Sequence, residues 1–486
     1  MNTHLQTGDH KSHSILRNVT NWIQRNPQRV VELLMVTGVL LGSILLAQIL
    51  PVEYMIFPLI MVVGVAALVI YLRTPQMGIL VFVIATLVIS FEIGTSTSTG
   101  INVTVILLPI LFGLWFVDMM IRKHHIEFVM SRPVYPLIAF AVICVISFGI
   151  GQLPWFVYAK AAPIMGQIAG LAIFILSVVA FLLVANVITD LIWLKRMTWV
   201  FLIMGAIYFS TRLFPQTQTM LIGLFPRGIG GSLLWVWLVA MAMSQAWINR
   251  ELGPYKRLAL AVFVGLMLYV GLIQSYEWKS GWIPELTVVW IIVFFYSPRL
   301  AILMALVGLI FLRDLPAQII ASDDYSFSTR VIAWEIIWKE LITVNPLLGL
   351  GPANYYYYTP LFPIMGYNVQ FNSHNNYLDI VAQVGILGFA AFMWFVVEIG
   401  VLGLRLRKKF DHTNGFTRAY VIGTLAGLGG SLVAGMLGDW LIPFVYNIGV
   451  RGFRSSVIAF IFLGGLVVIE QITAKQDALH SQRREG

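Results

Sequence analysis

Long apolar segments separated by short polar ones run through almost the whole chain. A helix that crosses about 30 Å of hydrocarbon needs roughly 20 apolar residues, and scanning at that length predicts fourteen membrane spans. The predicted spans lie near residues 31–50, 55–72, 77–94, 101–121, 134–150, 163–188, 197–212, 229–249, 257–275, 283–297, 299–313, 376–404, 418–438 and 453–473. The segments 283–297 and 299–313 are short and adjoining, so we expect about 12–14 transmembrane helices.

The spans divide the chain into five parts. We expect a basic N-terminal tail (1–30), a first helix bundle (31–313), a long loop (314–375), a C-terminal group of helices (376–473) and a short tail (474–486). Loops longer than about 12–15 residues are usually functional or disordered. The long loop holds two tryptophans and four consecutive tyrosines, which argues against disorder.

Within the long loop, the pattern from Arg330 predicts an amphipathic helix. Ser328 or Thr329 is the expected cap and Asn345-Pro346 the expected end, with apolar residues recurring at helical spacing. This helix either lies along the membrane surface or packs as a lid on the bundle. Arg330 would then lie at the helix N-terminus, where backbone N–H groups favour anions. The tyrosines at 355–358 either stack on sugar rings or belong to an interfacial aromatic belt.

Composition supports the same fold class. The chain is 59% hydrophobic and only 11% charged, whereas soluble domains carry roughly 25% charged residues. This excludes an ordinary soluble enzyme, and the single cysteine, Cys144, excludes an internal disulfide scaffold. The sequence therefore predicts an all-α polytopic membrane protein with one large extracytoplasmic loop.

The net charge of +9 is explained by topology. With the N-terminus inside, 22 of the 31 Lys and Arg residues fall in inner segments and nine in outer ones, as the positive-inside rule requires. We therefore expect a multi-pass protein of the cytoplasmic membrane, in contact with membrane lipids and not with nucleic acid. Both termini would be cytoplasmic, with the long loop outside. The N-terminus lacks the pattern of a removable signal peptide.

A few outer residues are candidates for chemistry. Of eight histidines only His374 faces outward in this topology, and histidine is the usual general base at neutral pH. Arg227, Lys279 and Arg330 are among the outer cations, and arginine in particular suits phosphate oxygens. The alternatives are that His374 only caps or anchors its helix and that the cations are snorkelling anchors. The residues offer no histidine pair or carboxylate cluster outside that would hold a metal.

The stretch Arg330–Gly388 resembles the C-terminal signature of the O-antigen ligase and O-antigen polymerase superfamily. The matching pieces are Arg330 with Trp334, the run Asn345-Pro346-Leu347-Leu348-Gly349-Leu350-Gly351, and Asn354-Tyr355. The most specific piece is His374-Asn375 followed, nine residues later, by Gly385-Ile386-Leu387-Gly388. The Thr-Trp that usually follows in the ligases is replaced by Phe389-Ala390, and the motifs do not separate ligase from polymerase.

The resemblance implies an inverting membrane glycosyltransferase with a GT-C-like helix bundle, working without metal or other cofactor at the outer face of the membrane. The donor would be a glycan on undecaprenyl pyrophosphate, and the acceptor a glycan, lipid or protein. Carried over by position, His374 is the catalytic base, Arg330 and Arg227 bind the donor pyrophosphate, and Lys279 is a third pyrophosphate ligand.

Two other classes of function remain open from the residues alone. A polysaccharide flippase or other transporter is one, although transporters usually carry ionisable residues in mid-membrane, whereas here the charges lie mostly at span ends. A noncatalytic scaffold of an envelope-assembly complex is the other.

Overall fold

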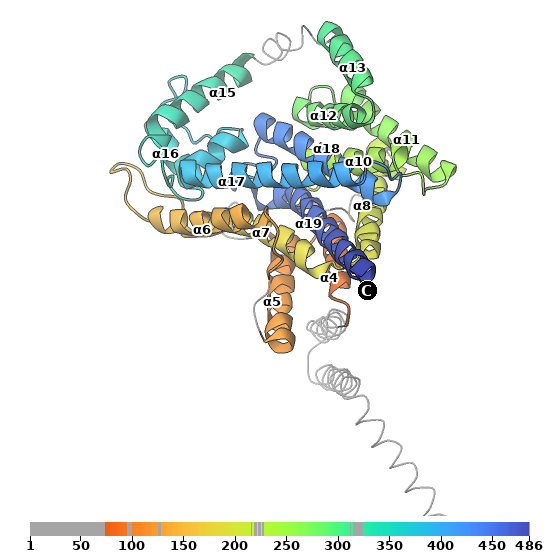
Figure 1. Cartoon of the computed structure of the whole chain (residues 1–486). Helices are drawn as coiled ribbons and strands as arrows, with labels where there is room; N and C mark the ends of the chain where they lie inside the picture. Colours follow the sequence, from red (N-terminus) through yellow and green to blue (C-terminus); the bar gives the residue numbers. More distant parts are fainter. Residues whose placement is uncertain are drawn as a thin grey trace, which may run out of the picture. The chain divides into compact units, whose positions relative to one another are not determined.

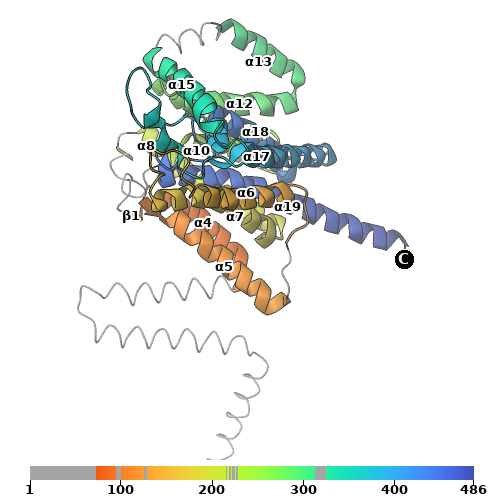
Figure 2. The same cartoon turned by 90° about the vertical axis from the view of Figure 1, so that its left-hand side faces the viewer.

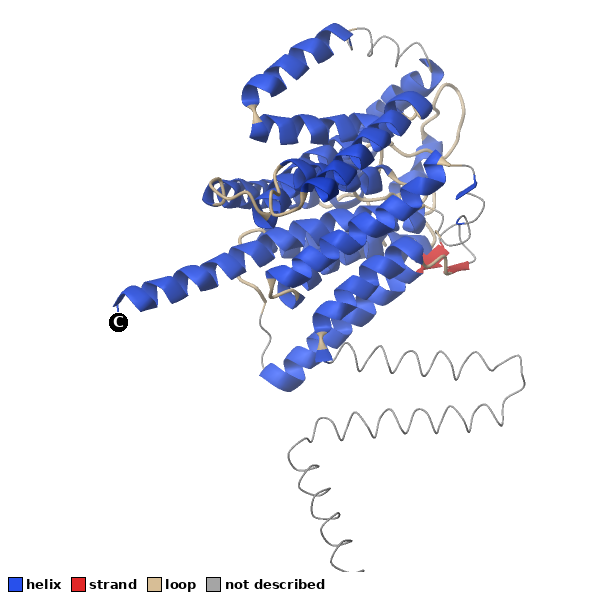
Figure 3. Ribbon diagram, turned by 90° about the vertical axis from the view of Figure 1, so that its right-hand side faces the viewer, coloured by secondary structure: helices blue, strands red, loops and turns tan. Residues whose placement is uncertain are grey.

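The computed structural model describes residues 73–485 except 95–99, 125–127, 215, 218–220, 222–224, 226–227, 312 and 314–323. This part of the chain is almost entirely helical (Figures 1 and 3). The longer helices are α4 (Pro75–Val88), α5 (Val103–Lys123), α6 (Val134–Ile150), α7 (Ile164–Val187), α8 (Leu191–Leu213), α10 (Ser232–Trp247), α11 (Pro254–Tyr269), α12 (Lys279–Tyr296), α13 (Pro298–Phe311), α15 (Asp324–Ile336), α17 (Asn376–Lys409), α18 (Phe416–Leu437) and α19 (Gly449–Glu485). The short elements are η2 (Val270–Gln274), η3 (Ile337–Ile342), α16 (Tyr355–Tyr358), η4 (Thr359–Leu361) and the strands β1 (Glu92–Gly94) and β2 (Gly100–Asn102).

The predicted spans can be compared with these helices from residue 77 onward. Each of the twelve spans there coincides with a helix, whereas the spans 31–50 and 55–72 and the tail 1–30 lie outside the described residues. By length and composition, seven of the described helices can cross a membrane, and several shorter apolar helices accompany them. The prediction of an all-α polytopic membrane protein is confirmed.

The span predicted over 77–94 ends early. The helix α4 ends at Val88, and β1 pairs with β2 in an antiparallel ribbon. Arg454 explains the stop, because its guanidinium is fully buried and donates to the carbonyls of Ile89 (2.8 Å) and Phe91 (3.0 Å). Arg454 thus has an internal structural role.

The core is formed by α7, α10, α18 and α19 together with the helices that pack against them. Every side chain of α10 from Ser232 to Ala246 is buried. The closest helix pairs are α12 with α18, α7 with α19, α10 with α18, and α6 with α17, the last of which lie alongside each other in Figures 1 and 2. Gly427 and Gly430 of α18 permit this approach, since a Cβ there would lie 2.8 Å from Trp237 and 2.6 Å from Val288. Small residues at such contacts are typical of packed membrane helices.

The long loop folds into α15, which continues as η3, and then α16 and η4. Helix α15 begins at Asp324, so the predicted cap at Ser328 or Thr329 is wrong. Arg330 therefore lies in the second turn and not at the helix N-terminus. Serine and threonine are only weakly disfavoured inside helices, so the residues before them decide where the helix starts.

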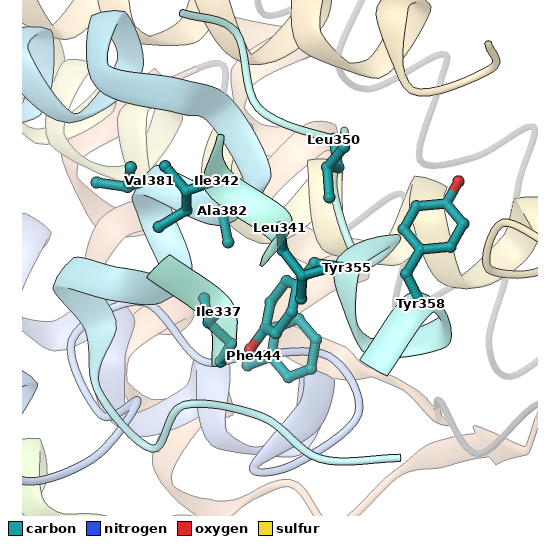
Figure 4. Close-up of a cluster of buried hydrophobic side chains, with 9 residues drawn as sticks. All are labelled: Ile337, Leu341, Ile342, Leu350, Tyr355, Tyr358, Val381, Ala382 and Phe444. Carbon is teal, nitrogen blue, oxygen red and sulfur yellow. The ribbon is translucent and has the colours of Figure 1, made fainter. Parts of the chain in front are cut away.

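The predicted helix packs on the bundle through one face. Ile337 and Leu341 are fully buried in a cluster with Tyr355 and Phe444 (Figure 4), whereas Trp338 on another face is 54% exposed. Burying each such aliphatic side chain contributes about 1.5–3 kcal/mol. This burial favours the lid interpretation over a helix lying free along the membrane surface.

The run at 345–351 docks into a break in α17. Gly385 has a φ of 71°, which interrupts the helix and frees backbone groups. Those groups pair with the docked run through Ile386 N to Pro346 O (2.8 Å), Leu387 N to Leu347 O (3.2 Å), Leu350 N to Ala382 O (3.0 Å) and Gly351 N to Gln383 O (2.9 Å). A Cβ on Gly385 would lie 2.1 Å from the Leu347 carbonyl oxygen, so only glycine fits. The two motifs form one structural unit that fixes the loop to the helix preceded by His374.

Candidate active site

His374 lies in a turn that leads directly into α17. Its φ of 48° is uncommon for a residue with a side chain and persists only where neighbours impose it. On the C-terminal side, Asn375 caps α17 by accepting from Tyr377 N (2.9 Å). The side chain of Asn376 accepts from Leu441 N (2.8 Å) and so ties the turn to the loop between α18 and α19.

On the N-terminal side, a buried polar network holds Ser373. Its Oγ donates to Asp379 Oδ1 (2.7 Å), and its backbone N–H donates to the Tyr355 hydroxyl (3.3 Å). The Tyr355 hydroxyl in turn donates to the same Asp379 oxygen. Ser373, Tyr355 and Asp379 are all buried. Hydrogen bonds among these buried groups support the turn, so the backbone at His374 is held from both sides.

Trp334 brings α15 to this turn. Its indole Nε1 donates to the Ser373 carbonyl (2.7 Å). Arg330 lies four residues earlier on the same helix, and residues at this spacing share a helix face. Two effects lower the pKa of the His374 imidazole to about 4. Burial is the larger, and the positive charge of Arg330 is the second. The ring is therefore neutral near pH 7, and the motif pair Arg330 and Trp334 has a physical explanation.

Asn447 and Asp439 hold the imidazole ring. Asn447 Nδ2 donates to Asp439 Oδ1 (2.6 Å) and lies 3.2 Å from His374 Nδ1. Because the carboxylate orients the amide nitrogen toward both groups, Nδ1 accepts and the neutral ring carries its proton on Nε2. Burial raises the pKa of Asp439 to about 6, while hydrogen bonds from Phe444 N and Asn447 oppose that rise.

Sequence reasoning missed Asn447 and Asp439, as well as the support from Ser373 and Asp379. Asp439 and Asn447 belong to the short segment between α18 and α19, which the predicted topology places on the same side as His374. The feature of the sequence that could have indicated a functional role for this segment was the presence of a carboxylate in so short a connection. Its pairing with Asn447 and His374 depends on the docking of separate helices.

The other predicted ligands are placed differently. Arg227 lies outside the described residues. Lys279 begins α12, has a side chain only 17% exposed, and forms an ion pair with Glu277 (3.5 Å). Its neighbour Trp278 contacts Trp440 (ring centroids 5.9 Å apart), the residue after Asp439. The structure thus brings His374 and Arg330 together and links the Lys279 segment to them through this ring contact.

The tyrosine run is neither an exposed sugar platform nor an interfacial belt at two of its positions. Tyr355 and Tyr358 are buried, and burial raises the pKa of the Tyr355 hydroxyl well above its usual value. Tyr356 and Tyr357 are half-buried, and the Tyr356 ring stacks on Tyr446 with centroids 5.1 Å apart. The aromatic rings pack the loop against the bundle.

The assembled residues can perform two chemical tasks. A neutral imidazole with an oriented ring can accept a proton from a hydroxyl, and a nearby guanidinium can bind a phosphate oxygen. Among the described residues, no group of three or more His, Cys, Asp or Glu side chains is arranged to hold a metal ion.

Comparison with known proteins agrees with the motifs. Residues 252–393, which include His374, Arg330 and the docked run, match the model of the O-antigen ligase family. No curated protein matches the chain. The match supports a function of the O-antigen ligase or polymerase type over the transporter and scaffold alternatives, and the apolar helices make the chain a multi-pass membrane protein. Over residues 252–393, this membrane protein is therefore similar to the O-antigen ligase family.

Proposed function

We propose that the protein is a metal-independent, inverting glycosyltransferase that transfers or polymerises glycan from an undecaprenyl-pyrophosphate donor. The reaction takes place at the outer face of the cytoplasmic membrane, and both termini of the chain are cytoplasmic. The observation that carries the proposal is the neutral imidazole of His374, held by Asn447 and placed beside the Arg330 charge within the matched segment.

His374 is the catalytic base in this proposal, and Nδ1 is the nitrogen that takes the proton. The acceptor hydroxyl replaces Asn447 Nδ2 as the donor to Nδ1 and loses its proton there as its oxygen attacks the anomeric carbon. The bond from that carbon to the pyrophosphate oxygen breaks, and the electron pair leaves with the pyrophosphate. Attack opposite the leaving group inverts the anomeric configuration. Asn447, displaced from Nδ1, keeps its hydrogen bond to Asp439.

Arg330 binds the pyrophosphate and stabilises its developing charge, with Arg227 and Lys279 as further ligands. Fixed cations in a poorly hydrated site stabilise such a leaving group without a metal. The same cation lowers the basicity of His374. Bound pyrophosphate neutralises the Arg330 charge and so raises the basicity of His374. When the pyrophosphate leaves, that charge is restored and the basicity of His374 falls.

The test is turnover of an undecaprenyl-pyrophosphate-linked oligosaccharide by the purified full chain. We expect His374→Ala to lose about 10²–10⁴-fold in rate, the contribution typical of a general base, and Arg330→Ala and Arg227→Ala to lose most of their activity. His412→Ala and Arg405→Ala are matched controls, because both residues are exposed and lie at the other end of α17 or just beyond it. Near-normal turnover in the His374, Arg330 and Arg227 variants would remove the mechanism. A ladder of lengthening lipid-linked products identifies a polymerase, and a single transfer to a second acceptor identifies a ligase.

A further inference from the structure

A cleft separate from the His374 turn opens among α8, α10, α11 with η2, and α12. Its volume is about 380 Å³ including the open mouth. One wall is η2, a π-helical turn, and such turns occur frequently at functional sites. The lining residues are Phe209, Arg212, Trp235, Met267, Val270, Gly271, Ser275, Trp278, Trp282 and Glu285.

Glu285 is the polar centre of this cleft. The residue is only 4% exposed, and its Oε2 atom has no hydrogen-bond partner. A buried carboxyl oxygen without a partner is costly, so a ligand that donates a hydrogen bond there would be bound favourably. Gly271 lets the backbone of η2 approach α12 closely here, since a Cβ at that position would lie 3.1 Å from the Trp282 Cβ and 3.4 Å from Glu285 Oε2.

Arg212 and three indole rings complete the lining. Arg212, in the last turn of α8, supplies donors on the same cleft. Trp235 Nε1 already donates to the Gly230 carbonyl (3.1 Å), and Trp282 Nε1 donates to the Tyr276 carbonyl (2.9 Å). Because their N–H groups are engaged, these two indoles contribute apolar ring surface to the cleft.

This combination selects a class of ligand. A carboxyl acceptor, a guanidinium donor and apolar ring surface match a pyranose, which carries hydroxyl groups around its edge and apolar C–H groups on its faces. A fully ionised phosphate offers only acceptors and an isoprenoid chain offers no polar group, so both would leave the unpaired Oε2 unsatisfied. We propose that the cleft binds a neutral pyranose unit of the glycan substrate. Only the identification of that sugar as part of the substrate rests on the proposed function.

The cleft is connected to the candidate active site through Trp278. This residue lines the cleft, and its ring contacts Trp440, the neighbour of Asp439. A sugar bound at Glu285 is thus linked by two packed rings to the residues that hold His374. The cleft is a positioning subsite for the glycan, and its residues do not act on the reacting atoms.

The test is saturation-transfer NMR on the purified full chain in an amphipol, because a sugar-headed detergent would occupy the cleft. The probes are the methyl glycosides of glucose, galactose, mannose, rhamnose and N-acetylglucosamine, with inorganic pyrophosphate as the anionic comparison. We expect transfer to at least one glycoside, reduced at least fivefold in Glu285→Leu and partly in Glu285→Gln, which keeps the shape of the side chain. Glu251→Gln is the matched control, because Glu251 is exposed and lies between α10 and α11 at their opposite ends.

Three outcomes overturn the proposal. The first is no saturation transfer to any glycoside, and the second is equal transfer in the wild type and in the folded Glu285→Gln and Glu285→Leu variants. Pyrophosphate binding that is lost on changing Glu285 would make the cleft an anion site and also refute it. His374→Ala should still bind the glycoside. Failure of the subsite is therefore distinguishable from failure of the catalytic proposal, which is measured by donor turnover.

Discussion

Replacing Arg330 with glutamine should raise the pKa of His374. Burial is the larger cause of the low pKa and the Arg330 charge the second. The variant value should therefore lie between about 4 and the ordinary 6.5. Arg330→Lys keeps a positive charge while losing the guanidinium fork, so its His374 should titrate close to the wild type.

The size of the effect follows from the two limiting values. At pH 5, an imidazole with a pKa of about 4 is about 91% neutral, whereas one with the ordinary pKa of 6.5 is only about 3% neutral. The wild-type base is thus available throughout the range in which an unperturbed histidine would be protonated. Without the Arg330 charge the imidazolium of His374 is no longer repelled. His374 is therefore protonated at a higher pH in the variant than in the wild type.

The assay is NMR of the full chain with histidine labelled at Cε1, in which the His374 signal is assigned by its loss in His374→Gln. Asp439 is the other titratable group of this turn, bridged through Asn447, and Asp439→Asn removes any inflection near its pKa of about 6. A wild-type His374 that titrates at pH 6 or above would refute the reasoning. An unchanged pKa in Arg330→Gln would refute the assigned role of the charge.

Further predictions concern the support of the site. Gly385→Ala should lower the free energy of unfolding by about 3 kcal/mol or more, measured by thermal unfolding, because the new Cβ meets backbone at a positive φ. Gly400→Ala in the same helix should be tolerated, and equal losses would contradict the docking argument. Tyr355→Phe should cost about 1–3 kcal/mol by stranding buried partners, whereas Tyr367→Phe, at 66% exposure, should cost nothing measurable. Trp334→Phe should lower donor turnover tenfold or more with the fold retained, and undiminished turnover would exclude its positioning role.

Most helices were predictable because one physical requirement determines them. In a bilayer, backbone groups must pair within the segment, so an apolar run of the right length becomes a helix. The exceptions are instructive. The 77–94 span stops at Val88, where the distant Arg454 binds the carbonyls that follow α4. The start of α15 was misplaced because a serine-threonine pair resembles a cap whether or not the helix continues upstream.

The candidate site was predictable only in part. His374 and Arg330 were accessible from the sequence because histidine and arginine are scarce in the segments predicted to lie outside. The tyrosine run was misread, since its composition suits an exposed surface as well as a core, and burial at Tyr355 depends on Asp379 from another helix. Asn447 is an ordinary polar residue until docking places it 3.2 Å from the imidazole.

By itself, the sequence determined that this chain is a helical membrane protein whose best motifs lie in one long loop, because hydropathy and local motifs are properties of contiguous residues. The tertiary structure decided which residues act together. It docked residues 345–351 into the break at Gly385, set Trp334 on the His374 turn, and brought Asn447 to the imidazole from a loop more than 70 residues away. It also opened a cleft at Glu285, whose buried oxygen has no sequence signature. Long-range contacts and the burial of polar groups arise only when separate helices pack, so no local pattern encodes them.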